Sequence, residues 1–120
     1  MRKLFIIFFY FLCFIASADN NQIVLRDTKH QHDHSEYYPP ADMPEVYYDD
    51  LNYDIIIVAD GFASYYDVDI ISQSTQLAVI STQIDGYGDT IDVSSLPVGC
   101  YAITIVSEFN NEFEGTFSTE

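Results

Sequence analysis

Short apolar runs recur at even spacing from residue 45 onward, and Gly, Asn, Asp and Ser residues separate them. Short strands with regular turn signals between them are typical of a β-sandwich or a β-barrel. The pattern predicts seven strands, at residues 46–48, 55–58, 66–71, 77–82, 90–93, 101–106 and 113–117. We therefore expect an all-β, antiparallel fold of about seven strands over residues 45–120.

Alternation within two of these runs indicates which side chains face the core. Val68 and Ile70 fall on one face of their run, whereas Asp67 and Asp69 fall on the other, because successive strand residues point to opposite faces. The same alternation in the run at 101–106 places three side chains on one face: Tyr101, Ile103 and Ile105. We predict that these three side chains pack in the core with Val68 and Ile70.

The connectors between the runs have the composition of turns. Asn110-Asn111 tolerates the positive φ of a tight hairpin turn. Residues 85–88 read Asp-Gly-Tyr-Gly, which predicts a loop.

Adjacent tyrosines occur at two of the predicted strands, as Tyr47-Tyr48 and Tyr65-Tyr66. Neighbouring residues of a strand point to opposite faces, so we expect one tyrosine of each pair to be buried and the other exposed. An exposed tyrosine suits a protein or glycan partner, although strand propensity alone also enriches tyrosine.

The first 18 residues read as a cleavable secretory signal peptide. Arg2 and Lys3 precede an apolar run at residues 4–15, and a small-x-small cleavage site follows. A bilayer span takes roughly 20 apolar residues and this run has 12, so cleavage is favoured over a retained anchor. The mature chain would begin at Asp19 and be extracytoplasmic: periplasmic, at the cell surface or secreted, with no membrane insertion after signal cleavage.

Removal of the signal peptide makes the chain more acidic. The whole sequence has a formal net charge of −15; without Arg2 and Lys3, two basic residues remain against 19 acidic ones, a net charge of −17. A field of that sign repels phosphate backbones and anionic headgroups, which disfavours nucleic acids and membrane surfaces as partners. Divalent cations, basic proteins and neutral glycans remain, and solubility is the simplest role for the charge.

Cysteine usage limits how the mature chain is stabilised. Cys100 would be its only cysteine, which excludes an intramolecular disulfide and leaves a packed core as the source of stability. The thiol either pairs between chains or is a small, partly buried side chain.

Residues 19–44 form a polar N-terminal arm by composition. The arm carries Pro39, Pro40 and Pro44, and proline is excluded from central strands because it lacks a backbone donor. Only residues 22–25 look like a strand, which we place at a sheet edge.

Three histidines in the arm are the candidate metal ligands. On an extended chain the alternate spacing of His30, His32 and His34 puts three imidazoles on one side, where their nitrogens would bind zinc or copper, or nickel. Asp27 and Glu36 are available to complete the set. The other interpretation is a solvated polar arm, since no packed shell would orient the rings.

No set of residues has a catalytic signature. A nucleophile needs a base held beside it, yet all three histidines lie in the arm and none is near Cys100 in the sequence. The acidic stretches at residues 49–54 and 85–92 lack the ligand spacing of a calcium loop. We predict a non-enzymatic protein with no cofactor other than zinc or copper at the histidines.

The C-terminal part of the chain carries a family resemblance. Residues 91–105 read Ile-Asp-Val-Ser-Ser-Leu-Pro-Val-Gly-Cys-Tyr-Ala-Ile-Thr-Ile, and residues 113–117 read Phe-Glu-Gly-Thr-Phe. The Leu-x-x-Gly-x-Tyr corner and the closing Gly-x-Phe resemble domain-of-unknown-function family 3244, small exported proteins of gut-type Gram-negative bacteria. The resemblance implies one immunoglobulin-like β-sandwich with no attached activity, and it covers roughly residues 19–120. Cys100 and the histidines depart from the family pattern.

Gly99 and Tyr101 make physical sense at such a corner. Glycine permits a sharp turn into the strand, and the tyrosine ring closes the end of the sandwich while its hydroxyl bonds back to the chain. The leading functional hypothesis is a non-enzymatic exported β-sandwich module that contacts an envelope protein or a glycan. The alternative is an extracytoplasmic metal-binding protein that uses the histidine arm.

The exported protein should begin at Asp19, because the small-x-small site ends at Ala18. The intact mass of the protein recovered outside the cytoplasm measures this directly. A product that retains residues 4–15 would contradict the export hypothesis.

Overall fold

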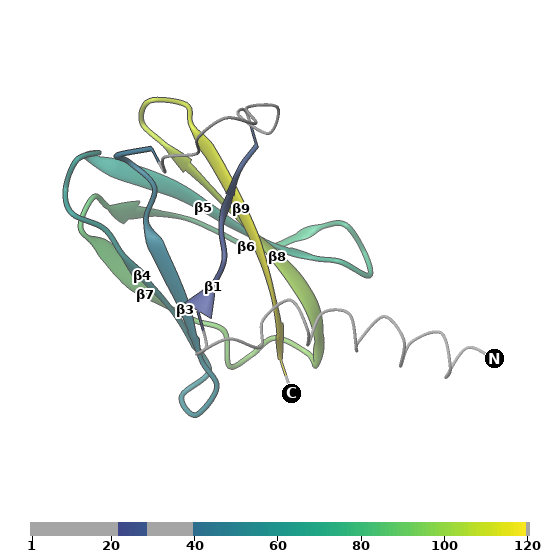
Figure 1. Cartoon of the computed structure of the whole chain (residues 1–120). Coiled ribbons are helices and arrows are strands. Elements are labelled where there is room, and N and C mark those ends of the chain that lie inside the picture. Colours follow the sequence, from purple (N-terminus) through teal and green to yellow (C-terminus); the bar gives the residue numbers. More distant parts are fainter. Residues whose placement is uncertain (1–21, 29–39, 120) are drawn as a thin grey trace.

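The computed structural model describes residues 22–28 and 40–119, and every regular element in these ranges is a β-strand. The strands form two layers that face each other (Figure 1). In chain order they are β1 (Gln22–Ile23), β2 (Arg26–Asp27), β3 (Glu45–Asp49), β4 (Asp54–Val58), β5 (Tyr65–Ser72), β6 (Ala78–Asp85), β7 (Gly88–Asp92), β8 (Gly99–Ser107) and β9 (Glu112–Thr119).

One layer is a four-stranded sheet of order β1-β3-β4-β7, and the other is a five-stranded sheet of order β2-β9-β8-β5-β6. All pairings are antiparallel. Hairpins join β3 to β4, β5 to β6 and β8 to β9, while the remaining connections cross between the sheets. The predicted all-β antiparallel sandwich is confirmed.

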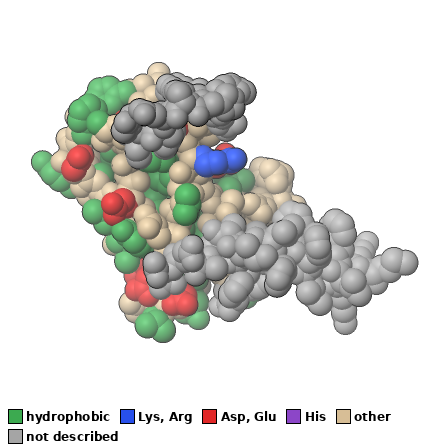
Figure 2. Space-filling model, viewed as in Figure 1, with side chains coloured by type: hydrophobic (Ala, Val, Ile, Leu, Met, Phe, Trp, Pro, Cys, Tyr) green, Lys and Arg blue, Asp and Glu red, His purple; other side chains and the backbone are tan. Residues whose placement is uncertain are grey.

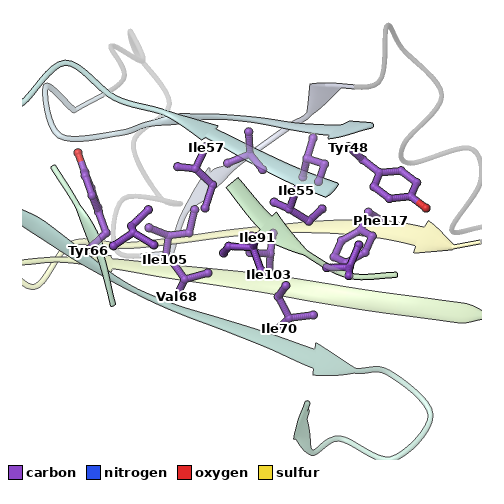
Figure 3. Packing of buried hydrophobic residues seen from close by; sticks show 14 of the residues in the cluster. Tyr48, Ile55, Ile57, Tyr66, Val68, Ile70, Ile91, Ile103, Ile105 and Phe117 are labelled. Atoms are coloured by element: carbon purple, nitrogen blue, oxygen red, sulfur yellow. The ribbon is translucent and has the colours of Figure 1, made fainter. Parts of the chain in front are cut away.

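The core lies between the two layers, where alternate side chains of facing strands meet (Figure 3). The register pairs Val68 of β5 with Ile105 of β8, and Ile70 with Ile103, and all four side chains are fully buried. Tyr101 is buried on the same face. The predicted inward set is confirmed, and each such aliphatic side chain contributes roughly 1.5–3 kcal/mol by leaving water.

Each of the seven predicted runs overlaps one strand. Two residues at the ends of these runs, Leu77 and Val93, lie outside the strands. Leu77 precedes β6 and is exposed, because Gln76 takes a positive φ of 62° in the β5–β6 turn and redirects the chain. Val93 follows β7, yet it is buried and its amide donates to the Tyr53 carbonyl at 2.9 Å. The predicted tight turn is confirmed at Asn110, whose φ is 65°.

The arm differs from the expected single edge strand. Its first part forms two short strands on different sheets: β1 pairs with β3, and β2 pairs with β9. Ile23 of β1 is almost completely buried in the core. Gly115 of β9 makes room for it, since a Cβ at Gly115 would lie 2.6 Å from Cγ2 of Ile23. The chain passes from the four-stranded to the five-stranded sheet between β1 and β2, so residues 22–28 belong to the sandwich.

The predicted tyrosine corner closes the end of the sandwich opposite the β8–β9 hairpin. The Tyr101 hydroxyl donates to the carbonyl of Pro97 at 2.5 Å, and its ring stacks on Phe117 at 5.5 Å between centroids. Thr119 holds the same corner from β9, because its Oγ1 donates to the Pro97 carbonyl and accepts from the Gly99 amide. Burial raises the pKa of Tyr101, which keeps its hydroxyl protonated as a donor.

Residues 22–28 and 40–119 contain no helix that is long and apolar enough to cross a membrane.

Ile103→Ala should lower the free energy of unfolding by about 2–5 kcal/mol, because it removes a fully buried side chain at the centre of the core. Urea unfolding measures the change. Thr104→Ala is the matched control, since Thr104 is the next residue of β8 and points to the other face; it should cost about 0.5 kcal/mol or less. Equal losses for the two variants would show that the register of β8 is wrong.

Candidate contact surface

Three connections and the residues before β3 meet at one end of the sandwich, which we call the loop end. It comprises residues 40–44, 59–64, 86–87 and 108–111. In Figure 1 these segments lie at the upper left and top, away from the C-terminus. Backbone and side-chain hydrogen bonds hold them together across long sequence distances.

The β4–β5 and β6–β7 connections are joined through their backbones. The Gly61 amide donates to the Gly86 carbonyl at 3.0 Å, and the Gly86 amide donates to the Ser64 carbonyl at 3.0 Å. The Ser64 amide in turn donates to Oε1 of Glu108 at 2.5 Å, which ties the β8–β9 hairpin to the pair. These bonds give the three connections a defined relative position.

Glycine is required at two points of this arrangement. A Cβ at Gly86 would lie 1.9 Å from the Ala63 carbonyl oxygen, and a Cβ at Gly88 would lie 1.9 Å from that of Ile57. Gly88 also has a φ of 101°, which other residues rarely adopt. The close backbone approach explains why the predicted 85–88 loop has this composition.

A buried carboxylate joins residues 40–44 to the β8–β9 hairpin. Asp42 is only 2% exposed, and its Oδ2 accepts from Oγ of Ser107 at 2.5 Å and from Nδ2 of Asn111 at 2.9 Å. Its backbone carbonyl accepts from the hydroxyl of Tyr66 at 2.8 Å. Charge-assisted hydrogen bonds of this kind are among the stronger ones in proteins, so Asp42 anchors the end of the arm.

Burial raises the pKa of Tyr66 to about 12, and the negative charges of Asp42, Asp60 and Glu108 add to the effect. The hydroxyl therefore stays protonated at ordinary pH and remains a donor to the Asp42 carbonyl. Asp42, Asp60 and Glu108 therefore lie close enough to Tyr66 to give the loop end a negative charge.

An aromatic patch covers the surface of the loop end. Three side chains form it, Phe62, Tyr87 and Phe109, and their exposed fractions are 57%, 73% and 52%. Tyr65, the first residue of β5, is also exposed and follows the β4–β5 connection. The Phe62 and Phe109 rings lie 5.6 Å apart in a tilted contact. Tyr87 packs on the backbone of Gly61, where a Cβ would come within 2.6 Å of its ring. Figure 2 shows apolar side chains gathered at the upper left, where Figure 1 places these connections.

Several loop aspartates have a local structural role. Each accepts a hydrogen bond from the backbone amide two residues later, an Asx turn, and the pairs are Asp49–Leu51, Asp60–Phe62, Asp85–Tyr87 and Asp92–Ser94. Hydrogen bonds from Asn52 and Ser94 lower the pKa of Asp49 and Asp92, respectively. Within the described ranges, no three His, Cys, Asp or Glu side chains are grouped to hold a metal ion.

The other predicted site residues fall in different places. His30, His32 and His34 lie outside the described residues, so the zinc or copper hypothesis stays a prediction. Cys100 is half-buried in β8, as expected for a small, partly buried side chain.

The tyrosine prediction is confirmed at Tyr65-Tyr66, where Tyr66 is buried and Tyr65 is exposed. At Tyr47-Tyr48 it holds for the buried Tyr48, whereas Tyr47 is half-buried and not exposed. Sequence reasoning placed Tyr65 in a surface role but missed the patch. The available signal was large aromatic residues inside polar connectors, at Phe62, Tyr87 and Phe109.

Comparison with known proteins supports the fold. No protein-family model matches this chain, and no curated protein matches it. A solved structure does match: a DUF3244 family protein with an immunoglobulin-like β-sandwich fold from Bacteroides vulgatus ATCC 8482, with a TM-score of 0.63. The chain is an immunoglobulin-like β-sandwich. The match covers 83% of this chain and 98% of that chain at 15% sequence identity.

This similarity confirms the predicted sandwich and the fold implied by the family resemblance. At 15% identity it shows the fold alone, and the matched protein belongs to a family without an assigned role. The function of the immunoglobulin-like sandwich must therefore be argued from its own surface.

Asp42→Ala should lower the free energy of unfolding by about 1–3 kcal/mol, because Ser107 and Asn111 lose a buried acceptor. Chemical unfolding measures the loss, and amide exchange should accelerate at residues 108–111. Asp50→Ala is the control that removes the same charge from an exposed turn. If Asp50→Ala costs as much, net charge rather than the buried network determines the effect.

Proposed function

We propose that this chain is an exported, non-enzymatic β-sandwich module that acts by contact with an envelope protein or a glycan through its loop end. The observation that supports the proposal most directly is the exposed aromatic patch on three connections. Residues 1–18 supply the expected export signal, and the compartment is the periplasm, the cell surface or the medium.

Exposed aromatic side chains are common where proteins bind partners. Phe and Tyr are enriched at interfaces relative to the rest of the surface, and they supply large contact areas with few rotatable bonds. Here Phe62 and Phe109 come from connections that are 47 residues apart in the chain yet in ring contact. Such a cluster depends on the fold and presents a composite surface.

The patch is also held in place before a partner arrives. Phe62 follows the Asx turn of Asp60, and Tyr87 follows that of Asp85. Ala63, which follows Phe62, is buried, and its carbonyl oxygen lies 1.9 Å from where a Cβ at Gly86 would be, so the connection has little freedom. A preorganised surface loses less conformational entropy on binding, so the loop end suits recognition.

The chemistry of the patch fits a protein or a glycan. Aromatic faces stack on apolar side chains and on sugar rings, and the neighbouring carboxylates of Asp60 and Glu108 accept hydrogen bonds or pair with cations. Nucleic acid and anionic lipid are disfavoured by the same carboxylates.

The double variant Phe62→Ala/Phe109→Ala should reduce partner capture about tenfold or more, since central aromatic side chains typically supply more than 1 kcal/mol each. Capture is measured by pull-down from the native cell envelope and by binding to an immobilised glycan panel. Leu51→Ala/Val98→Ala is the matched control, because both side chains are strongly exposed at the opposite end. Equal capture by both double variants would refute a role for the loop end.

A further inference from the structure

The four sheet edges of the described chain differ in how well they are protected. Exposed edges are normally kept short or charged, because an unpaired strand attracts another strand. β1 and β2 have two residues each, and β7 carries Asp89 and Asp92. β6 has eight residues, with no charged side chain before Asp85 and no proline. β6 is therefore a long edge that lacks these protective features.

β6 is also open to solvent along most of its length. β6 is the last strand of the five-stranded sheet, and among the described strands only β5 pairs with it. Ile84 is its one buried side chain, and Val79 is 42% exposed. The irregularity in pairing lies between Ile70 and Ile71 of β5, opposite the start of β6. The stretch from Ile80 to Asp85 therefore remains a regular, accessible edge.

The outer face of the same sheet is acidic. The register aligns Asp67 with Val106 and Glu112, and it aligns Asp69 with Thr104 and Glu114. These positions alternate with the buried residues of their strands, so they point away from the core. Within residues 22–28 and 40–119, one basic side chain lies on this face, that of Arg26 on β2. Its Nη2 is 3.6 Å from Oε1 of Glu114.

A strand added along β6 would continue this pattern. Its outward side chains would lie beside Ser81 and Gln83, which pair with Asp69 and Asp67. Two strand spacings, about 10 Å, would separate its backbone from β5, a distance that long Lys or Arg side chains span toward a carboxylate. Its inward side chains would lie beside Ile80 and Ile84 at the border of the core.

We propose that the β6 edge binds an extended segment of another protein that carries Lys or Arg at alternate positions and apolar residues between them. Backbone hydrogen bonds to β6 supply affinity, and the basic side chains complement Asp67 and Asp69. A second copy of this chain is a poorer fit, because two mature chains of net charge −17 repel each other. This site is separate from the aromatic patch, and it does not depend on the loop end binding a partner.

The test titrates the processed protein with a synthetic peptide of alternating Lys and Val, at physiological ionic strength. Binding should protect backbone amides of Ala78–Asp85 from hydrogen exchange. A peptide of the same sequence with N-methyl groups at alternate residues keeps the charge but loses backbone donors, so it should bind about tenfold more weakly. Equal binding of the two peptides, or protection confined to other segments, would overturn the proposal.

A pair of variants separates the edge from general charge attraction. Ser81→Lys places a charge on the edge itself and should weaken binding about tenfold. Thr116→Lys adds the same charge to the same face, on β9 three strands away, and should weaken it less than about threefold at this ionic strength. Equal effects of the two variants would refute the edge site. So would a processed protein that is dimeric until Ser81→Lys separates it, since a second copy would then be the occupant.

Discussion

Burial of alternate side chains between two antiparallel sheets is the interaction on which the rest of this structure depends. In a chain of strong negative charge, the inward positions of β4, β5, β8 and β9 are almost entirely aliphatic or aromatic. Their removal from water is the main force opposing charge repulsion and chain entropy. Because the expected mature chain has one cysteine, no internal cross-link would share this role.

Packing of the two sheets fixes where the connections between strands meet. Strand ends of both sheets bring residues 59–64, 86–87 and 108–111 to one end, where Gly86 and Gly88 allow backbones to approach closely. Asp42 then joins the arm to the β8–β9 hairpin from a buried position. Aromatic side chains remain outside because the inward positions are already filled, and they form the patch on which the proposed contact function rests.

The acidic residues of the chain fall into groups with different physical roles. Loop aspartates accept backbone hydrogen bonds in Asx turns, and Asp42 is a buried acceptor. Carboxylates on the outer face of the five-stranded sheet have one described basic neighbour, Arg26. The unprotected β6 edge lies beside that face, so a basic extended segment is the partner that fits both features.

Local sequence determined the strands, their inward faces and the tyrosine corner. The period of two is a property of neighbouring residues, which is why Val68, Ile70, Ile103 and Ile105 could be assigned to the core before any pairing was known. The turn at Asn110 and the corner of Tyr101 depend equally on residues close in sequence. The sequence also predicts an export signal at residues 1–18 and metal ligands at His30, His32 and His34, and both stay predictions.

Only the tertiary structure decided which strands lie at edges and which connections meet. The contact of Phe62 with Phe109, the burial of Ile23 against Gly115 and the exposure of β6 all depend on the order of strands in the sheets. That order is set by pairing between distant segments, and no local pattern encodes it. The edge strand predicted at residues 22–25 is present as β1, but β2 on the other sheet was missed. A short apolar segment reads the same whether it stays on one sheet or passes between two.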